Sequence, residues 1–341
     1  MVEYYARGGS TIKQKHNKLE LSTKLVIDEA LRRNVEVEVL DEADNIIRLR
    51  KGEKVEYVKK ATMTSLDKYI VPLLMNNKEV TKIILREHDL SVPDGIIIDS
   101  VEKANKSFSQ FKGKAIVVKP KSTNFGLGVQ MLNKDVSLSE FTYAIKQAFT
   151  YDKTVMIEQF IPGKEYRFLV IDNQVIAILH RIPANVTGDG KLTIEELVAK
   201  KNDDPLRGKG HVTPFECIIL GKIELECLRM QGKDKAYIPK KGETVYLREN
   251  SNVSTGGDSI DYTDDVIDEY KHIAIKAVKA LGAKICGLDM IIADVQAMPN
   301  SQNHSIIELN FNPAIYMHNF PYQGTNRHVE RKVLDLLGFS S

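Results

Sequence analysis

The chain has 341 residues, of which 43% are hydrophobic and 28% are charged, and this is enough for two or three packed subdomains of an ordinary globular protein. Its net charge of only +2 gives no global reason to expect binding to nucleic acid or to an anionic membrane. No apolar run reaches the roughly 18 residues of a membrane span, and the N-terminus lacks the apolar segment of a signal peptide. The three cysteines have no metal-like spacing, so reduced thiols and a cytoplasmic location are expected.

The first part of the chain predicts a polar tail and then a small α/β unit. Residues 1–18 contain Gly and Lys but few apolar residues, as is typical of a tail or linker. Residues 19–76 form the expected unit, with a helix from Ser22 onward and strands at 35–39, 46–49 and 54–58.

The next unit is expected to cover residues 77–154 and begins with a helix that ends before Val92 and Pro93. Two apolar strands, 115–120 and 129–132, then enclose a loop of small residues that includes two glycines. Glycines let backbone amides approach phosphate oxygens closely, and Lys119 on the first strand could reach the same phosphates. A plain hairpin turn would give the same pattern.

The last unit is expected to cover residues 155–341. It begins with two strands joined by a Pro-Gly turn, and the second strand carries Glu165 and Arg167. Residues 185–214 are rich in Gly, Asp and Lys around one short helix, which predicts an inserted loop excursion.

Two apolar strands near the C-terminus, 285–292 and 305–309, carry a candidate metal site. Asp289 lies on the first strand, and Glu308 and Asn310 alternate along the second so that their side chains share one face. Oxygen ligands of this kind suit Mg²⁺, which commonly shares its remaining positions with nucleotide phosphates. The alternative is that these residues are ordinary strand ends.

In this order, the motifs resemble the ATP-grasp carboxylate–amine ligases: a lysine helix, a Lys-Pro strand with a glycine loop, a Glu-Gln-Phe-Ile hinge, an Asp strand and Glu-x-Asn-x-Asn-Pro. The chain resembles most closely the ligase module of the bifunctional glutathione synthases and is also similar to part of the cyanophycin synthetases. This closer resemblance rests on the segments 181–190, 204–208 and 247–261, and residues 312–322 favour the glutathione branch. It extends from about residue 19 to residue 337.

The resemblance implies an α/β ATP-grasp fold, in which two α/β subdomains clasp ATP after a small N-terminal α/β unit. It also implies Mg²⁺ or Mn²⁺ at Asp289, Glu308 and Asn310. The implied ATP contacts are Lys78, Lys119, Ser122, Asn124, Phe125, Gly126 and Gly128 for the phosphates, Glu158, Gln159, Phe160 and Ile161 for adenine, and Glu165 for ribose. Lys82 lies one turn beyond Lys78 and could replace it.

The resemblance also implies catalytic roles for Lys119 and Arg248, with Arg248 facing the transferred phosphoryl group and the acyl intermediate. A surface arginine at a strand end is the alternative for Arg248. Further candidates for substrate contact are Arg167, Arg181, Asn250, Ser254, Thr255, Gly256 and Asn312. The two arginines could instead form structural salt bridges.

A carboxylate is a poor electrophile, so an amide-forming ligase first converts it to an acyl phosphate and needs cations around the transferring group. The expected reaction joins γ-glutamylcysteine and glycine at the expense of ATP. The alternatives are a related peptide or amino-acid ligase, resembling cyanophycin synthetase, and a regulatory module that binds ATP without turnover.

The partners expected from the resemblance are small-molecule substrates, with no nucleic acid and no membrane, and a homodimer is compatible with it. In the family, a γ-glutamylcysteine-forming domain precedes the ligase region, whereas only about eighteen residues precede it in this sequence. The dipeptide would then come from a separate or formerly fused synthetase, unless the sequence is a fragment or the substrate differs.

Overall fold

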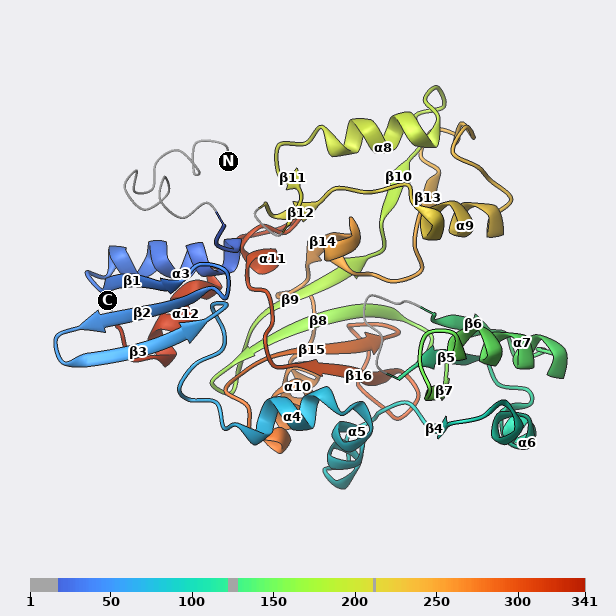
Figure 1. Cartoon of the computed structure of the whole chain (residues 1–341), viewed down its shortest axis with the longest axis horizontal. Coiled ribbons are helices and arrows are strands. Elements are labelled where there is room, and N and C mark those ends of the chain that lie inside the picture. The colour runs from blue at the N-terminus through green and yellow to red at the C-terminus, as the bar shows by residue number, and fades with distance from the viewer. Residues whose placement is uncertain (1–17, 122–127, 211–212, 341) are drawn as a thin grey trace.

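The computed structural model describes residues 18–121, 128–210 and 213–340, and Figure 1 shows their arrangement. The tail predicted for residues 1–18 therefore lies, apart from Lys18, outside the described residues. The same holds for four of the predicted ATP contacts: Ser122, Asn124, Phe125 and Gly126.

Helices and strands alternate along most of the chain. The longer helices are α3 (Leu21–Arg32), α4 (Ile70–Asn76), α5 (Lys78–Glu87), α6 (Val101–Phe111), α7 (Leu138–Phe149), α8 (Ile194–Asn202), α9 (Lys222–Met230), α10 (Asp268–Leu281) and α12 (Val329–Leu336), with the short α11 (Tyr316–Asn319) and the 3₁₀ turn η1 (Val253–Thr255).

Three antiparallel sheets organise these elements, and Figure 1 shows them from left to right. The first is β1 (Glu36–Asp41), β2 (Ile46–Lys51) and β3 (Lys54–Lys59). The central sheet has the order β14 (Asp258–Asp261), β9 (Gln174–Ile182), β8 (Lys164–Ile171), β15 (Ile285–Ile292) and β16 (His304–Asn310). The third has the order β4 (Gly95–Ile98), β7 (Val155–Gln159), β5 (Ile116–Pro120) and β6 (Gln130–Leu132).

One face of the central sheet is largely apolar. On β8, Tyr166, Phe168 and Val170 point to this face, and Leu288 and Met290 of β15 join them in one core cluster. Helices α4, α5 and α10 contribute the opposite side of that core. Because side chains alternate across a strand, the residues between these positions must all point to the other face.

The other face is apolar at one end only. Leu169, Ile171, Ala177 and Ile285 pack there in a core shared with the first sheet and with helices α3 and α12. Further along β8 and β15, the alternation brings Glu165, Arg167 and Asp289 to this face, while Leu179 of β9, opposite Arg167, packs against Leu21 and Leu25 of α3.

Arg33, just after α3, joins the beginning of the described chain to its end. Its side chain is buried and contacts Glu29 at 2.9 Å and Asp335 of α12 at 2.6 Å, and it donates to the Phe339 carbonyl at 2.8 Å. A guanidinium with several planar donors is well suited to hold two helices in a fixed register.

Replacing Arg33 should therefore cost much more stability than replacing its neighbour. R33M leaves Glu29 buried without its buried partner, and we expect the free energy of unfolding to fall by about 3 kcal/mol. R32M is the matched control, since Arg32 contacts the same Glu29 at 3.0 Å but is half exposed, and we expect a loss below about 1 kcal/mol. Urea denaturation of the two variants measures the difference, and equal losses would show that burial of Arg33 is unimportant.

The inserted excursion is longer and better packed than the sequence predicts. Strand β10 (Asn185–Thr187) pairs with β13 (Thr244–Tyr246), and a separate small core extends from Ala184 to Leu247. The excursion also contains α8, α9 and the two-stranded pair β11 (Arg207–Gly208) and β12 (Phe215–Glu216). Its second half was missed because pairing between strands almost 60 residues apart leaves no local periodicity.

Candidate active site

The register of the central sheet brings the predicted metal ligands and Arg167 into one row. Asp289 on β15 lies opposite Arg167 on β8 and opposite Glu308 on β16. Asn310 lies opposite Gly287, one step along the same face. Residues directly opposite in an antiparallel sheet have Cβ atoms about 5 Å apart, so this row is a direct consequence of strand pairing. The row lies at the polar end of the face.

Asp289 is the buried centre of this row, with only 2% of its surface exposed. Arg167 holds both of its carboxylate oxygens, at 2.7 Å from Nη2 to Oδ2 and through a second contact from Nε to Oδ1. Arg181 adds a contact to Oδ2 at 3.1 Å, and the Asn310 amide donates to the same oxygen at 3.4 Å. Burial alone would raise the pKa of Asp289, but the two guanidinium groups lower it, so the carboxylate is ionised.

Glu165 connects this centre to a loop of the chain at residues 250–257. Its carboxylate accepts from Arg181 and from the Ser251 hydroxyl. Arg181 also donates to the Asn252 side chain at 3.5 Å. The loop that was expected to meet substrate therefore borders the carboxylate that was expected to meet ribose. Ser251 was not among the predicted site residues, although it lies within segment 247–261, one of the segments on which the closer family resemblance rests.

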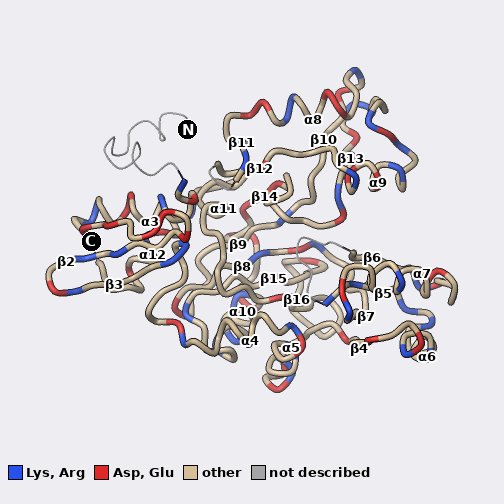
Figure 2. The backbone as a smooth tube through the Cα atoms, viewed as in Figure 1, with Lys and Arg blue, Asp and Glu red and all other residues tan. Residues whose placement is uncertain are grey.

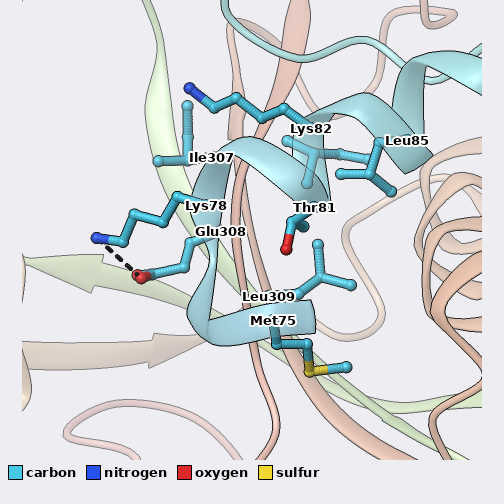
Figure 3. A pocket seen from close by; sticks show the side chains of 9 residues that line it. Met75, Lys78, Thr81, Lys82, Leu85, Ile307, Glu308 and Leu309 are labelled. Carbon is cyan, nitrogen blue, oxygen red and sulfur yellow. Dashed lines mark ion pairs between the residues drawn. The ribbon is translucent and has the colours of Figure 1, made fainter. Parts of the chain in front are cut away.

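Helix α5 contributes two lysines that face different sheets. Lys78 Nζ lies 3.2 Å from Glu308 Oε1 of the central sheet, as the dashed line in Figure 3 shows. Lys82, one turn later, is not joined to Glu308 in the same view and pairs with Glu158 of β7 in the third sheet. Glu158 uses its other oxygen to hold Lys119 Nζ at 2.5 Å. One buried carboxylate thus bridges two ammonium groups, and α5 joins the two sheets.

Burial and neighbouring cations lower the pKa of both lysines that contact Glu158. The pKa of Lys82 falls to about 7, chiefly because of burial and then because Lys119 lies nearby. The pKa of Lys119 falls to about 8, again chiefly through burial, with Lys78 adding to the effect. Lys78 is more exposed than Lys82, with side-chain exposures of 25% and 9%. Lys78 is therefore the lysine of α5 that is better placed to reach a ligand.

A divalent cation fits the donor set of Asp289, Glu308 and Asn310. The two carboxylates and one amide oxygen are hard donors, and the strand register places them side by side. Within the described residues, no group of three or more His, Cys, Asp or Glu side chains could hold a metal, so an amide ligand would be needed here. Both carboxylates already have cationic partners: Arg167 pairs with Asp289, and Lys78 pairs with Glu308. The row therefore attracts positive charge.

Other predicted residues have their contacts elsewhere. Arg248 pairs through Nε with Glu224 of α9 at 2.5 Å, inside the excursion. The side chain of Asn312 accepts from Thr62 at 2.8 Å. The backbone N–H groups of Gln159 and Phe160 donate to the carbonyls of Asp94 and Ala115, so in this structure they belong to the frame of the third sheet. The functional roles of these residues stay predictions.

Gly128 closes the glycine loop in a conformation that requires glycine. Its φ is +76°, and a Cβ at this position would lie 2.7 Å from both Pro120 and Tyr151. A side chain would be strained and would also collide with the strand that carries Lys119.

The comparisons with known proteins agree with this geometry. Residues 17–70 match the ATP-grasp-like domain family, and residues 75–191 match the RimK-like ATP-grasp domain family. The predicted fold class is confirmed: the chain has a mixed α/β architecture and the ATP-grasp fold. Membership of this class implies the use of ATP.

Within this class, the chain is similar to the bifunctional glutathione biosynthesis protein GshAB. It is 54% identical to the protein from Clostridium perfringens and 53% identical to that from Enterococcus faecalis, in each case over 94% of this chain. The bifunctional glutathione synthetase of Pasteurella multocida gives a structural match with a TM-score of 0.75 and 44% identity over 95% of this chain. The chain spans about two fifths of the length of these relatives, 41% and 42% of the two sequences and 44% of the solved chain.

Two physical features agree with the composition of the chain. Lys and Arg residues are interspersed with Asp and Glu residues over the elements drawn in Figure 2. None of the described helices combines the length and the apolar character that crossing a membrane requires.

The two lysines of α5 should respond differently to substitution. K82M leaves Glu158 buried with one cation instead of two, so we expect the free energy of unfolding to fall by about 3 kcal/mol. K78M removes a partly exposed partner of Glu308, and we expect a loss below about 1 kcal/mol together with an ATP dissociation constant raised about tenfold. Chemical denaturation and ATP titration measure the two effects. A K82M protein as stable as the wild type, or a K78M protein with normal ATP binding, would contradict this assignment.

Proposed function

We propose that the chain is an ATP-dependent ligase that joins γ-glutamylcysteine to glycine and releases glutathione, ADP and phosphate. The observation that carries this proposal is the similarity of 94% of the chain, at up to 54% identity, to proteins named for glutathione biosynthesis. The row of Arg167, Asp289 and Glu308 supports it, because an ATP-consuming ligase needs oxygen ligands for a metal beside cations for its anionic reactants.

The lysines and the glycine loop form the nucleotide side of the proposed site. Lys78 and Lys119 would hold the phosphates, and Lys82 would keep Glu158 in place when Lys119 turns to its ligand. Mg²⁺ or Mn²⁺, when bound by Asp289, Glu308 and Asn310, would neutralise charge on the phosphates. The backbone around Ile161 would meet adenine, and Glu165 would meet ribose.

The arginines form the substrate side of the proposed site. The acyl-donor carboxylate and the acyl phosphate made from it are both anionic, so guanidinium groups would bind and orient them. Arg181 has a buried Nε for which the described residues supply no hydrogen-bond acceptor. Arg181 therefore has hydrogen-bonding capacity beyond its contacts to Asp289 and Glu165.

Arg248 would face the acyl group from the excursion, where Glu224 holds its Nε atom. The loop residues Asn250, Ser254, Thr255 and Gly256, together with Asn312, would border the acceptor. Closing this side against water would protect the acyl phosphate from hydrolysis before the amine attacks.

The proposal extends to the setting of the reaction. The two clasping units would be residues 77–154 and 155–341, preceded by the small unit at 19–76. A cytoplasmic location agrees with the three free cysteines. A separate or fused γ-glutamylcysteine synthetase would supply the dipeptide, and a homodimer is part of the same proposal.

Phosphate release tests the reaction directly. We expect purified protein with Mg-ATP, γ-glutamylcysteine and glycine to release phosphate well above the rate without glycine, because the amine is needed to complete turnover. Mass spectrometry of the product should show glutathione. No release above background with this pair, but release with another carboxylate and amine, would replace glutathione by a different amide product.

The metal site has its own test. D289N and E308Q should each lower kcat by at least about 100-fold, since each removes a charged ligand close to the transferred phosphoryl group. Circular dichroism checks that the variants are folded. Near-normal turnover in both folded variants would remove this row of residues from the reaction.

A further inference from the structure

A second buried cluster of charges lies where the excursion meets the central sheet, and the proposed reaction does not use it. Its centre is Asp258 at the start of β14. Arg207 of β11 contacts Asp258 Oδ1, and Lys201 of α8 lies 2.6 Å from Oδ2. The Asn185 amide donates to the same Oδ2 at 3.1 Å. The cluster contains the arginine of the segment 204–208, which the sequence singles out without giving it a role.

Arg207 is the most fully buried cation in this cluster, with no side-chain exposure. Besides Asp258, its guanidinium donates to the Glu216 carbonyl at 2.9 Å and to the Gly256 carbonyl at 3.3 Å. The ring of Phe215 lies 5.3 Å from the guanidinium carbon, within the range of a cation–π contact. These partners belong to three separate segments: β12, β14 and the loop at 250–257.

The loop at 250–257 is thereby fixed at both ends. At its beginning, Ser251 and Asn252 contact Glu165 and Arg181 of the candidate active site. At its end, Arg207 holds Gly256.

The backbone of the loop is also tightly enclosed. Added Cβ atoms would lie 2.7 Å from Ile218 at Gly256 and 2.7 Å from the Ile182 carbonyl at Gly257. The loop is therefore held by close packing as well as by the hydrogen bond from Arg207.

We propose that Arg207 is a positioning residue for the acyl-donor carboxylate substrate, acting through Gly256 and the loop at 250–257. The inference rests on the proposed function, since it assumes that this loop borders the dipeptide. Arg207 holds the Gly256 end of the loop, whereas Ser251 at the other end contacts Glu165, the residue assigned to ribose, so the effect of Arg207 should be larger on the carboxylate substrate than on ATP.

The charge of Arg207 and its geometry can be separated by substitution. R207K keeps a cation beside Asp258, but a single ammonium group cannot reproduce the planar donors that reach Gly256 and Glu216. K201M is the matched control, because it removes the other cation on Asp258 and leaves the contact to Gly256 in place. F215L removes the ring beside Arg207 without changing any charge. It replaces R207K as the test variant if R207K does not fold.

The expected kinetic result is a split between the two substrates. R207K should raise KM for γ-glutamylcysteine about tenfold, the effect of one lost charge-assisted hydrogen bond, and leave KM for ATP within about twofold. F215L should change KM in the same direction by a smaller factor, and K201M should leave it unchanged. Equal shifts of both KM values, or equal effects of R207K and K201M, would overturn the proposal and leave Arg207 a purely structural residue.

Hydrogen exchange decides the question even if the wild-type chain does not make glutathione. The backbone N–H groups of Thr255, Gly256 and Gly257 donate to Asn252 and Val253 carbonyls, so their exchange reports whether the loop is held. R207K should increase exchange in peptides covering 250–257 and K201M should not. Absence of turnover in the wild type would contradict only the proposed reaction. Unchanged exchange in both R207K and F215L would contradict the proposed role of Arg207.

Discussion

The ion pair between Arg167 and Asp289 is the interaction on which the candidate site depends. It joins the neighbouring strands β8 and β15 of the central sheet where they change from apolar to charged on one face. A buried carboxylate without partners would be very costly, and Asp289 avoids this cost through two arginines and an amide. Such pairs are not strong sources of net stability. A buried cluster of charges of this kind is typical of a functional site.

The pleat of the sheet explains how one set of strands can serve a core and a site. On β8, every second residue enters the core with α10, and the residues between them begin with Glu165 and Arg167 and continue with Leu169 and Ile171. The N-terminal unit packs on the apolar part of this face, and the charged residues of β8 and β15 lie beside it.

Sequence reasoning predicted the row of proposed metal ligands because its signal is local. Asp289, Glu308 and Asn310 lie in apolar strands with period-two alternation, and antiparallel pairing of two such strands is enough to bring them together. It could not choose between Lys78 and Lys82, because both lie on one helix face and only the partners, Glu308 and Glu158, distinguish them. It also missed Glu224 and Thr62, whose contacts to Arg248 and Asn312 depend on tertiary packing across 24 and 250 residues.

The excursion also depends on contacts between distant residues that local sequence patterns do not reveal. This dependence has a consequence for substrate specificity. The proposed nucleotide side of the site lies on sheets whose strands are recognisable from their residues, and the proposed substrate side depends on a loop held by contacts between distant segments. Arg207 reaches Gly256 across 49 residues, and Ser251 reaches Glu165 across 86. A fold that binds ATP through local strand patterns and its other substrate through such long-range contacts can change the second without disturbing the first. Substrate choice within this class should therefore follow the packing of the excursion more closely than the motifs of the sheet.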